Sequence, residues 1–193
     1  NENKNQLYMV HEDVVKPDMY EKYDAASKGF VELFNELKIS SMSSASMTRD
    51  FRYFYLTPID NYSDIDKLQE EWDKAIKNAP EGKFEEAYSK FEGCYDTHND
   101  YIVKKHDDLS YWPDEPRISV DEINYLDWGF YRFKDGHGKN VEEIAKKFKQ
   151  VYLDKGIKDG YSIYTADIGM ERNVWIVVNI YLTYNSFAVV IAW

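Results

Sequence analysis

One order of secondary-structure elements occurs twice in this chain, and this repetition limits the possible folds more than any other feature of the sequence. A strand, a helix, two strands and the start of a further helix are predicted over residues 7–65, and the same series is predicted over 125–193. Turn residues and the apolar stripes of the helices fall at matching places in the two copies. The sequence therefore predicts an internal duplication.

The alignment of the two copies holds nearly throughout their length. Residues 7–39 lie over 125–157 without a gap, at a constant separation of 118 positions. After the helices the separation becomes 123, so that Phe51 falls on Val174. On this alignment the second copy has five extra residues before its hairpin.

The stretch 173–181 is the strongest strand signal in the chain, and its two faces differ. One face is aliphatic, with Val174, Ile176, Val178 and Ile180. The other mixes aromatic and polar groups, with Trp175, Val177, Asn179 and Tyr181. Because successive side chains of a strand point to opposite sides of the sheet, we expect the aliphatic face to pack under helices and the mixed face to line a wetter interior.

Between the two copies the pattern changes. Apolar residues spaced three and four apart predict an amphipathic helix over 84–102, and a loop rich in proline and acidic residues follows at 107–116. We therefore divide the chain into a first repeat (1–80), a helical insertion and loop (81–120) and a second repeat (121–193). The second repeat ends before the further helix and fourth strand that a complete copy would contain, so its tail is expected to be missing.

Composition excludes several classes of protein. The chain has 193 residues, of which 44% are hydrophobic and 17% aromatic, which is enough for a substantial core. Its net charge is −11 and its Lys and Arg residues form no stripe, so nucleic-acid binding is not expected. An acidic surface also repels anionic membranes, and no run of 18 apolar residues predicts a transmembrane helix.

The single cysteine and the first residue bear on cellular location. Cys94 excludes an internal disulfide and is best read as a small buried hydrophobe. The sequence begins at Asn1 and not at Met, which fits an exported protein after removal of a signal peptide. A periplasmic or secreted location and a cytoplasmic one both stay open.

A strand-helix-strand-strand unit buries one sheet face under its helices and leaves the other face open. Two such units can cover each other by closing into one barrel. On its two strand-turn-helix segments and hairpins, over residues 7–76 and 125–193, the chain resembles the dimeric α/β-barrel superfamily of ferredoxin-like domains, with both halves fused. The resemblance implies an α+β fold, an antiparallel barrel with helices outside, and no need for a second chain to close it.

That superfamily includes cofactor-free monooxygenases, muconolactone isomerases, haem peroxidases, chlorite dismutases and ligand-sensing domains, so the fold alone fixes little about function. The resemblance favours a small hydrophobic or aromatic ligand, bound between the two sheets, with or without cofactor-independent chemistry on it. The alternative is a non-catalytic structural or interaction protein whose barrel core is filled.

The duplication also predicts which residues face the barrel interior. If the mixed face of 173–181 points inward, the two separations assign the equivalent positions, and these are Met9, His11, Asp13, Arg52, Phe54, Leu56, Asp127, Gly129 and Tyr131. From these and the mixed face we select five ligand-binding candidates, Asp127, Tyr131, Trp175, Asn179 and Tyr181. A mostly apolar pocket with a few converging polar groups is typical of a small-molecule site.

Two of the inward residues are candidate catalytic groups. His11 could act as a general base or a haem ligand, and Arg52 could hold a carboxylate or a developing oxyanion. The structural alternative is that Arg52 pairs with Asp127 or Asp13 and that His11 is a hydrogen-bonded histidine at a strand end.

No metal site and no cofactor are predicted, with haem kept as the alternative. His98 and His106 are eight positions apart, whereas histidine pairs that bind a metal from one helix are usually three or four apart. The volume of the lumen distinguishes the hypothesis of a ligand-binding barrel from that of a structural barrel. An open lumen would favour a ligand site, and a lumen filled by Trp175, Phe54 and Tyr131 would favour a structural barrel.

Overall fold

The computed structural model of the chain describes residues 5–39, 44–119, 122–123, 125–181 and 188–191. In chain order its strands and helices are β1 (Leu7–Val15), a 3-10 turn (Pro17–Met19), α1 (Tyr20–Leu37), β2 (Ser44–Thr48), β3 (Arg52–Ile59), α2 (Asp64–Asn78), α3 (Lys83–Ser89), β4 (Tyr95–Lys105), β5 (Tyr125–Arg132), α4 (Gly138–Lys155), β6 (Tyr161–Ala166), β7 (Val174–Tyr181) and β8 (Ala188–Ile191). Among these helices none has the length and apolar character needed to cross a membrane.

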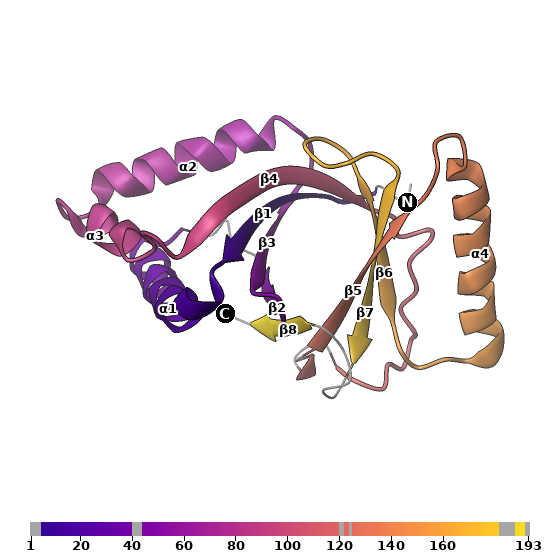
Figure 1. Cartoon of the computed structure of the whole chain (residues 1–193). Helices are drawn as coiled ribbons and strands as arrows, with labels where there is room; N and C mark the ends of the chain where they lie inside the picture. The colour runs from indigo at the N-terminus through magenta and orange to yellow at the C-terminus, as the bar shows by residue number, and fades with distance from the viewer. Residues whose placement is uncertain (1–4, 40–43, 120–121, 124, 182–187, 192–193) are drawn as a thin grey trace.

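The strands close into one barrel in the order β1-β3-β2-β8-β5-β7-β6-β4 (Figure 1). The order repeats after four strands, since β1, β3, β2 and β4 correspond to β5, β7, β6 and β8. The fourth strand of each copy joins the two copies, because β4 pairs with β1 and with β6, and β8 pairs with β5 and with β2. The predicted α+β fold of two fused repeats is confirmed.

The ends of α1 and α4 show how closely the copies match. Each helix ends at a residue in the left-handed conformation, Lys38 with φ 57° and Gly156 with φ 56°. The next amide donates back into the last turn in both copies, from Ile39 to the carbonyl of Phe34 and from Ile157 to that of Tyr152, at 3.0 Å each. The separation of 118 positions is therefore correct over this part of the chain.

The separation predicted for the hairpins is wrong by one residue. Phe51 and Asn173 occupy the same place in their copies, with φ of 61° and 60°. The carbonyl of Phe51 accepts from the amide of Val15, and the carbonyl of Asn173 accepts from the amide of Phe133. These pairs place β3 and β7 122 positions apart and not 123, whereas β2 and β6 keep the separation of 118, because Ala45 pairs with Tyr55 and Ile163 with Val177. A slip of one residue moves every side chain of a strand to the other face.

The barrel lumen is lined by apolar side chains, and it takes the aliphatic face of β7. Its buried cluster consists of Val10, Phe54, Leu56, Tyr101, Val103, Ile176 and Val178. Phe54 is fully buried and stacks on Trp128, with ring centroids 4.8 Å apart. The prediction that the aliphatic face of β7 packs under helices is therefore wrong. The lumen is the drier side of this sheet, so it takes the more apolar residues.

One ion pair lies within the lumen. Arg52 points inward as predicted, and its Nε donates to Glu12 Oε1 at 2.6 Å. Its guanidinium lies 5.2 Å from the ring centre of Phe54 and 5.7 Å from that of Phe130. The partner of Arg52 is thus Glu12, and neither Asp127 nor Asp13 as the sequence suggested. Glu12 is deeply buried, so the pair is part of the core.

The helix predicted over 84–102 is wrong in its second half. The helix α3 ends at Ser89, Gly93 turns the chain with φ 76°, and β4 begins at Tyr95. The apolar residues of β4 alternate, with Tyr101 and Val103 in the lumen and Ile102 packed outside, which over a short run resembles helical spacing. The insertion therefore supplies a barrel strand. The fourth strand expected to be missing from the second copy is present as β8, whereas the helix start predicted at 184–186 lies outside the described residues.

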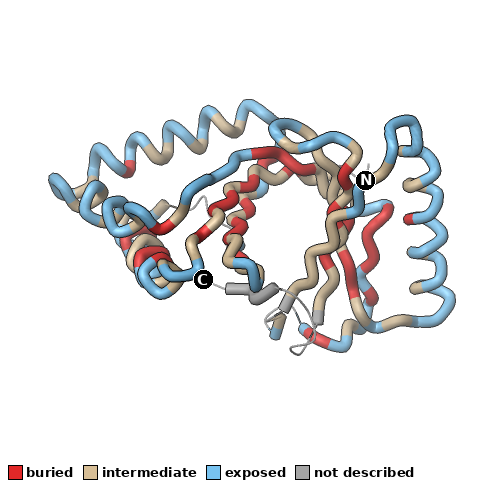
Figure 2. The backbone as a smooth tube through the Cα atoms, in the orientation of Figure 1, coloured by how far each residue is buried: buried red, intermediate tan, exposed pale blue. Residues whose placement is uncertain are grey.

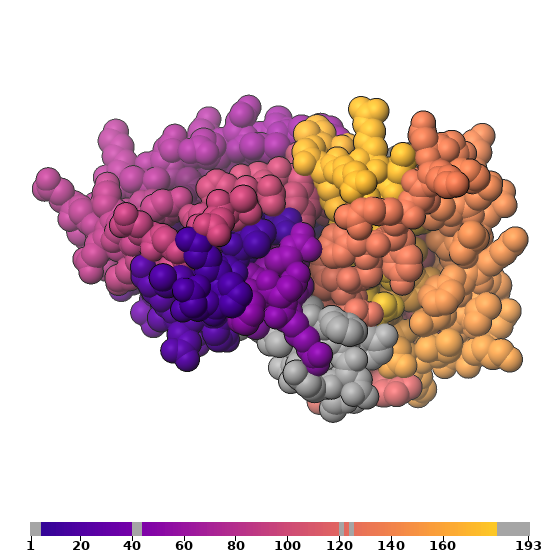
Figure 3. Space-filling view, in the orientation of Figure 1, coloured from indigo at the N-terminus to yellow at the C-terminus, as the bar shows by residue number. Residues whose placement is uncertain are grey.

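Different elements cover the outer faces of the two halves (Figures 1 and 2). The helices α1, α2 and α3 lie over β1, β3 and β4. Over β6 and β7, the segment 106–118 runs between the sheet and α4, and its Leu109 and Tyr111 are buried in a cluster with Ala145, Tyr161 and Ile163. In the space-filling view the two halves form one continuous body, with the first copy in indigo to magenta and the second in orange to yellow (Figure 3).

Candidate functional site

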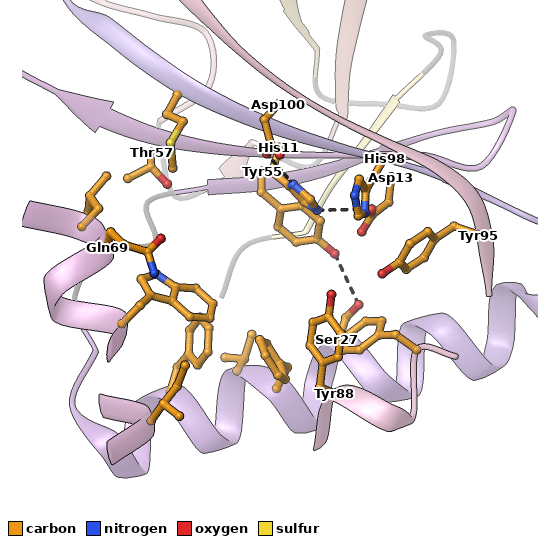
Figure 4. Close-up of a pocket in the computed structure, with 18 of the residues that line it drawn as sticks. His11, Asp13, Ser27, Tyr55, Thr57, Gln69, Tyr88, Tyr95, His98 and Asp100 are labelled. Carbon is orange, nitrogen blue, oxygen red and sulfur yellow. Dashed lines mark hydrogen bonds and ion pairs between the residues drawn. The ribbon is translucent and has the colours of Figure 1, made fainter. Parts of the chain in front are cut away.

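A cavity of about 410 Å3 lies outside the barrel, between the sheet and the helices of the first copy (Figure 4). Its floor is the outer face of β1, β3 and β4, and its walls come from α1, α2 and α3. The apolar residues that line it are Met9, Phe30, Val31, Phe34, Ile65, Leu68, Trp72, Ile76 and Phe91. The sequence analysis placed the cavity between the sheets, but the described side chains there form the packed lumen.

The aromatic walls result from the spacing of α1. Residues three and four apart share one face of a helix, and Tyr23, Ser27, Phe30 and Phe34 therefore all face the sheet side. Phe34 meets Trp72 of α2 edge-on at 4.8 Å, and Phe30 meets Phe84 of α3 at 5.5 Å. These ring contacts hold the three helices together at the far side of the cavity.

Four ionisable side chains gather at one end of the cavity, all from β1 and β4 (Figure 4). The strand register places His11 opposite Asp100 and Asp13 opposite His98. Alternate residues of a strand share a face, so all four project toward the helices. His11 and Asp100, which are 89 positions apart in the sequence, thus lie side by side on the outer face of the sheet, next to the pair of Asp13 and His98.

His11 lies between two carboxylates. Its Nδ1 is 2.7 Å from Asp100 Oδ1, and its Nε2 is 3.2 Å from Asp13 Oδ1. Burial lowers the pKa of His11, but the hydrogen bonds and charges of Asp13 and Asp100 outweigh burial and raise it from 6.5 to about 9. His11 is therefore a cation at neutral pH in the structure as it stands.

Asp13 is the buried member of the cluster, with a side chain only 7% exposed. The hydroxyl of Tyr23 donates to its Oδ2 at 2.5 Å, and Tyr23 is in turn 2.9 Å from the hydroxyl of Tyr55. Burial raises the pKa of Tyr23, and it raises that of Tyr55 to about 12, so both hydroxyls keep their protons. The other oxygen, Asp13 Oδ1, is buried, and apart from the 3.2 Å contact with His11 Nε2 it has no well-aligned hydrogen-bond donor.

The five ligand-binding candidates from the sequence do not line this cavity. Trp175 lies on the outer face of β7, stacked on His106 at 6.2 Å and packed in the cluster under α4. Asn179 and Asp127 pair across β7 and β5 on that same outer face, and Tyr131 is 57% exposed. The side chain of Tyr181 lies outside the described part of the chain. The prediction that Trp175, Asn179, Asp127 and Tyr131 point into the lumen is wrong, because it took the mixed face of β7 and the His11 face of β1 as the inward faces, whereas the aliphatic faces of both strands fill the lumen.

The two candidate catalytic residues lie on opposite faces of the sheet. His11 was predicted to face the lumen, and this is wrong, since its ring faces the external cavity. Arg52 does face the lumen and is held there by Glu12. The structure therefore brings His11 together with Asp13, but it separates both from Arg52.

Several residues of the site were missed by the sequence analysis. His98 and Asp100 were placed on a helix, and only the correct assignment of β4 sets them beside β1. Tyr23 belongs to the apolar stripe of the first predicted helix, which served only to align the two copies, and Ser27 was not singled out. The run of aromatic and β-branched residues Tyr101, Ile102 and Val103 is the signal that could have identified the strand.

The barrel order, the duplication and the external helices define the fold as one closed α/β barrel built from two repeats in one polypeptide. No protein-family model matches the sequence, and a search of curated proteins finds no match. Solved structures do match. A candidate monooxygenase from Fusobacterium nucleatum subsp. nucleatum has a TM-score of 0.56 at 13% identity, over 93% of this chain and 77% of that one. An anthrone oxidase-like protein has a TM-score of 0.57 at 12% identity, over 94% and 75%.

A third match, a haem-binding protein from Thermus thermophilus, has a TM-score of 0.41 at 11% identity, over 91% of this chain and 78% of that one. A match of that quality supports no argument. At these levels of identity the first two matches show the fold alone.

Proposed function

We propose that this protein binds a small, flat aromatic molecule in the cavity under α1, α2 and α3. The observation that supports this proposal is a cavity of about 410 Å3 with aromatic walls and a charged end formed by His11, Asp13, His98 and Asp100. Small-molecule sites generally have about 300–1,000 Å3 of mostly apolar space with a few converging polar groups. The site lies outside the barrel, and the rest of the sequence-based expectation, a hydrophobic or aromatic ligand, is kept.

The aromatic wall of the cavity would contact the rings of such a ligand, and the charged end would contact its polar group. Phe30, Phe34 and Trp72 offer ring faces and edges for stacking. At the other end the carboxylates can accept from a hydroxyl group, and the cationic His11 favours an oxygen that carries negative charge. A ring system with one hydroxyl or keto oxygen would satisfy both ends.

The reaction that we propose on this ligand is oxidation by O2 without an organic cofactor. It is supported by the fold shared with a candidate monooxygenase and an anthrone oxidase-like protein. For an anthrone, the ring methylene loses its two hydrogens and gains one oxygen atom. One anthrone and one O2 then give one anthraquinone and one water, so the electrons balance.

The experiment has a binding part and a turnover part. Protein dialysed against EDTA is titrated with anthraquinone, an unreactive analogue, and quenching of tryptophan fluorescence is followed, since Trp72 lines the cavity. Oxygen uptake is then measured with anthrone in air-saturated buffer. We expect saturable binding of one ligand per chain, and oxygen uptake above the rate without protein.

His11→Gln and His137→Gln form a matched pair of variants. His137 is exposed at the start of α4, remote from the cavity lining, so its replacement should change nothing. His11→Gln removes the cation, and we expect it to lower oxygen uptake at least tenfold while anthraquinone still binds. Absence of saturable binding across a panel of two- and three-ring ketones and phenols would refute the proposal. Binding without turnover would reduce it to a binding protein.

The alternative of a non-catalytic barrel with a filled core draws support from the packed lumen, but a filled lumen does not close the external cavity. The haem alternative fits His11 poorly, because both ring nitrogens face carboxylates. Addition of haem to the purified protein tests it, since ligation by a histidine would produce a sharpened, shifted Soret band.

A further inference from the structure

Three side chains at the polar end of the cavity have the composition of a transition-metal site. One ligand atom each from His11, Asp13 and His98 lies within 4.8 Å of the others. Two imidazoles and one carboxylate that leave further positions open are the ligand set of non-haem iron centres and of several zinc centres. Among the described residues, His11, Asp13 and His98 are the one group of three or more His, Cys, Asp or Glu side chains whose ligand atoms all lie within 4.8 Å of one another.

The spacing of the two inner ligands already fits one ion. Donor atoms at about 2.1 Å from a tetrahedral or octahedral metal lie roughly 3.0–3.5 Å apart. His11 Nε2 and Asp13 Oδ1 are 3.2 Å apart. His98 is exposed on β4, so its side chain is free to rotate toward the pair without rearrangement of the core.

The surroundings of Asp13 Oδ1 also fit a bound cation. This oxygen is buried, and apart from the 3.2 Å contact with His11 Nε2 it has no well-aligned hydrogen-bond donor, although a buried carboxylate oxygen normally has one. The hydroxyl of Tyr23 satisfies the other oxygen, and this leaves Oδ1 on the side of His11. A metal ion at this point would take the place of the His11 proton as the partner of Oδ1.

Asp100 orients the histidine. A carboxylate can only accept, so His11 must keep a proton on Nδ1 to bond Asp100 Oδ1 at 2.7 Å. A metal ion would therefore displace the other proton of the cationic His11, the one on Nε2, which is the nitrogen that faces Asp13. A carboxylate behind a ligating histidine is the usual support of a metal-bound imidazole.

We propose that His11, Asp13 and His98 bind one divalent first-row transition-metal ion, with Asp100 and Tyr23 holding the first two ligands in position. The three protein ligands leave coordination positions open toward the apolar cavity. The inference goes beyond the proposed function, because metal binding is measured without any organic ligand. Failure of one test leaves the other intact.

The test uses tag-free protein, dialysed against EDTA and titrated with Co2+ and Zn2+. Visible absorption of bound Co2+ and calorimetry with Zn2+ should each give one ion per chain. We expect His98→Ala and Asp13→Asn to weaken binding at least tenfold, and Asp100→Asn by about tenfold through the orientation of His11. His137→Ala is the control and should bind as the wild type does.

Two results would overturn the inference. One is the absence of saturable Co2+ and Zn2+ binding by the wild type, and the other is unchanged affinity in both His98→Ala and Asp13→Asn. If Asp13→Asn does not fold by circular dichroism, the exposed His98 decides the matter alone. Binding of Ca2+ as tight as that of Zn2+ would refute the assignment to a transition metal, since Ca2+ prefers an all-oxygen ligand set.

Discussion

Over the first copy of the repeat, the space between the sheet and its helices is a cavity, whereas over the second copy the corresponding space holds residues 106–118. The scaffolds are equivalent strand by strand. At the position of His11 the second copy has Gly129, and at that of Asp13 it has Tyr131. In this barrel, whether a site exists depends on what covers the outer face and on a few residues of the first strand, and not on the fold.

Both copies contribute side chains to the lumen, and a substitution there should give the largest change in the free energy of unfolding. Arg52→Leu leaves Glu12 as a buried charge without its partner. Removal of one partner of a buried pair costs about 3–5 kcal/mol, so we expect that loss in the free energy of unfolding, measured with urea. Anthraquinone affinity should be unchanged, because Arg52 faces away from the cavity.

The double variant Glu12→Leu/Arg52→Leu is the control for this prediction. It removes both charges and should recover most of the lost stability. A stability loss below about 1 kcal/mol in Arg52→Leu would mean that the pair is solvated, as for a surface pair.

The next test compares the filled and the open space by one substitution in each. Leu109 is 2% exposed within the plug of the second copy, whereas Leu68 is half-buried at the edge of the cavity. We expect Leu109→Ala to cost about 3 kcal/mol and Leu68→Ala about 1 kcal/mol, since only the first leaves a void in close packing. Equal losses in urea unfolding would show that the two spaces are equally packed.

A third test fills the open space. Thr57 lines the cavity on β3, and Asn179 holds the equivalent place on β7. Thr57→Phe should weaken anthraquinone binding at least tenfold in the fluorescence titration, with no loss of stability. Asn179→Phe is its matched control and should leave the affinity unchanged. The reverse order of effects would move the ligand site to the outer face of the second copy.

The smallest expected effect is a dependence of stability on pH that the second copy cannot have. The folded pKa of His11, about 9, lies above its ordinary value of 6.5. The charged form therefore stabilises the fold fully below pH 6.5, and this contribution is lost as the pH rises toward 9. Since the side chain is 38% exposed, we expect a change of no more than about 1 kcal/mol.

The measurement is urea unfolding between pH 6 and 9.5 in the presence of EDTA, for the wild type and His11→Gln. The slope attributed to His11 should disappear in the variant. A wild-type slope that persists unchanged in His11→Gln would assign it to other groups.

Most of the fold could be predicted from the sequence, because periodicity and turn residues determine the strands and helices locally. The strand 7–15, the helices α1, α2 and α4 and the duplication itself were all visible in this way. The faces of the hairpin strands were not, since alternation shows that a strand has two unlike faces but not which of them packs inward. The choice of the mixed face of 173–181 as the inward one reversed Trp175 and Asn179 while leaving the element order intact.

The site was harder to predict than the fold for a related reason. His11 and Asp13 were both predicted to line a site from the correct strand but were assigned to the wrong side of it. Their partners His98 and Asp100 reach them only through the pairing of β1 with β4, which is a long-range contact. No spacing within the sequence encodes that contact, so no local motif could reveal the cluster.

The fourth strand of each copy pairs with a strand of the other copy, so both sheets keep an unpaired edge while the chain is being synthesised on the ribosome. β2 pairs with β8, from Ala45 with Ile191 to Thr48 with Ala188, so one edge of the first sheet has no partner until the last strand has emerged. β4 likewise has only β1 beside it until β6 has been synthesised. Contacts so distant in sequence form slowly, and open sheet edges can recruit other chains. Nascent copies of this protein that stall before β8 should therefore be the forms most prone to aggregate and most in need of chaperones.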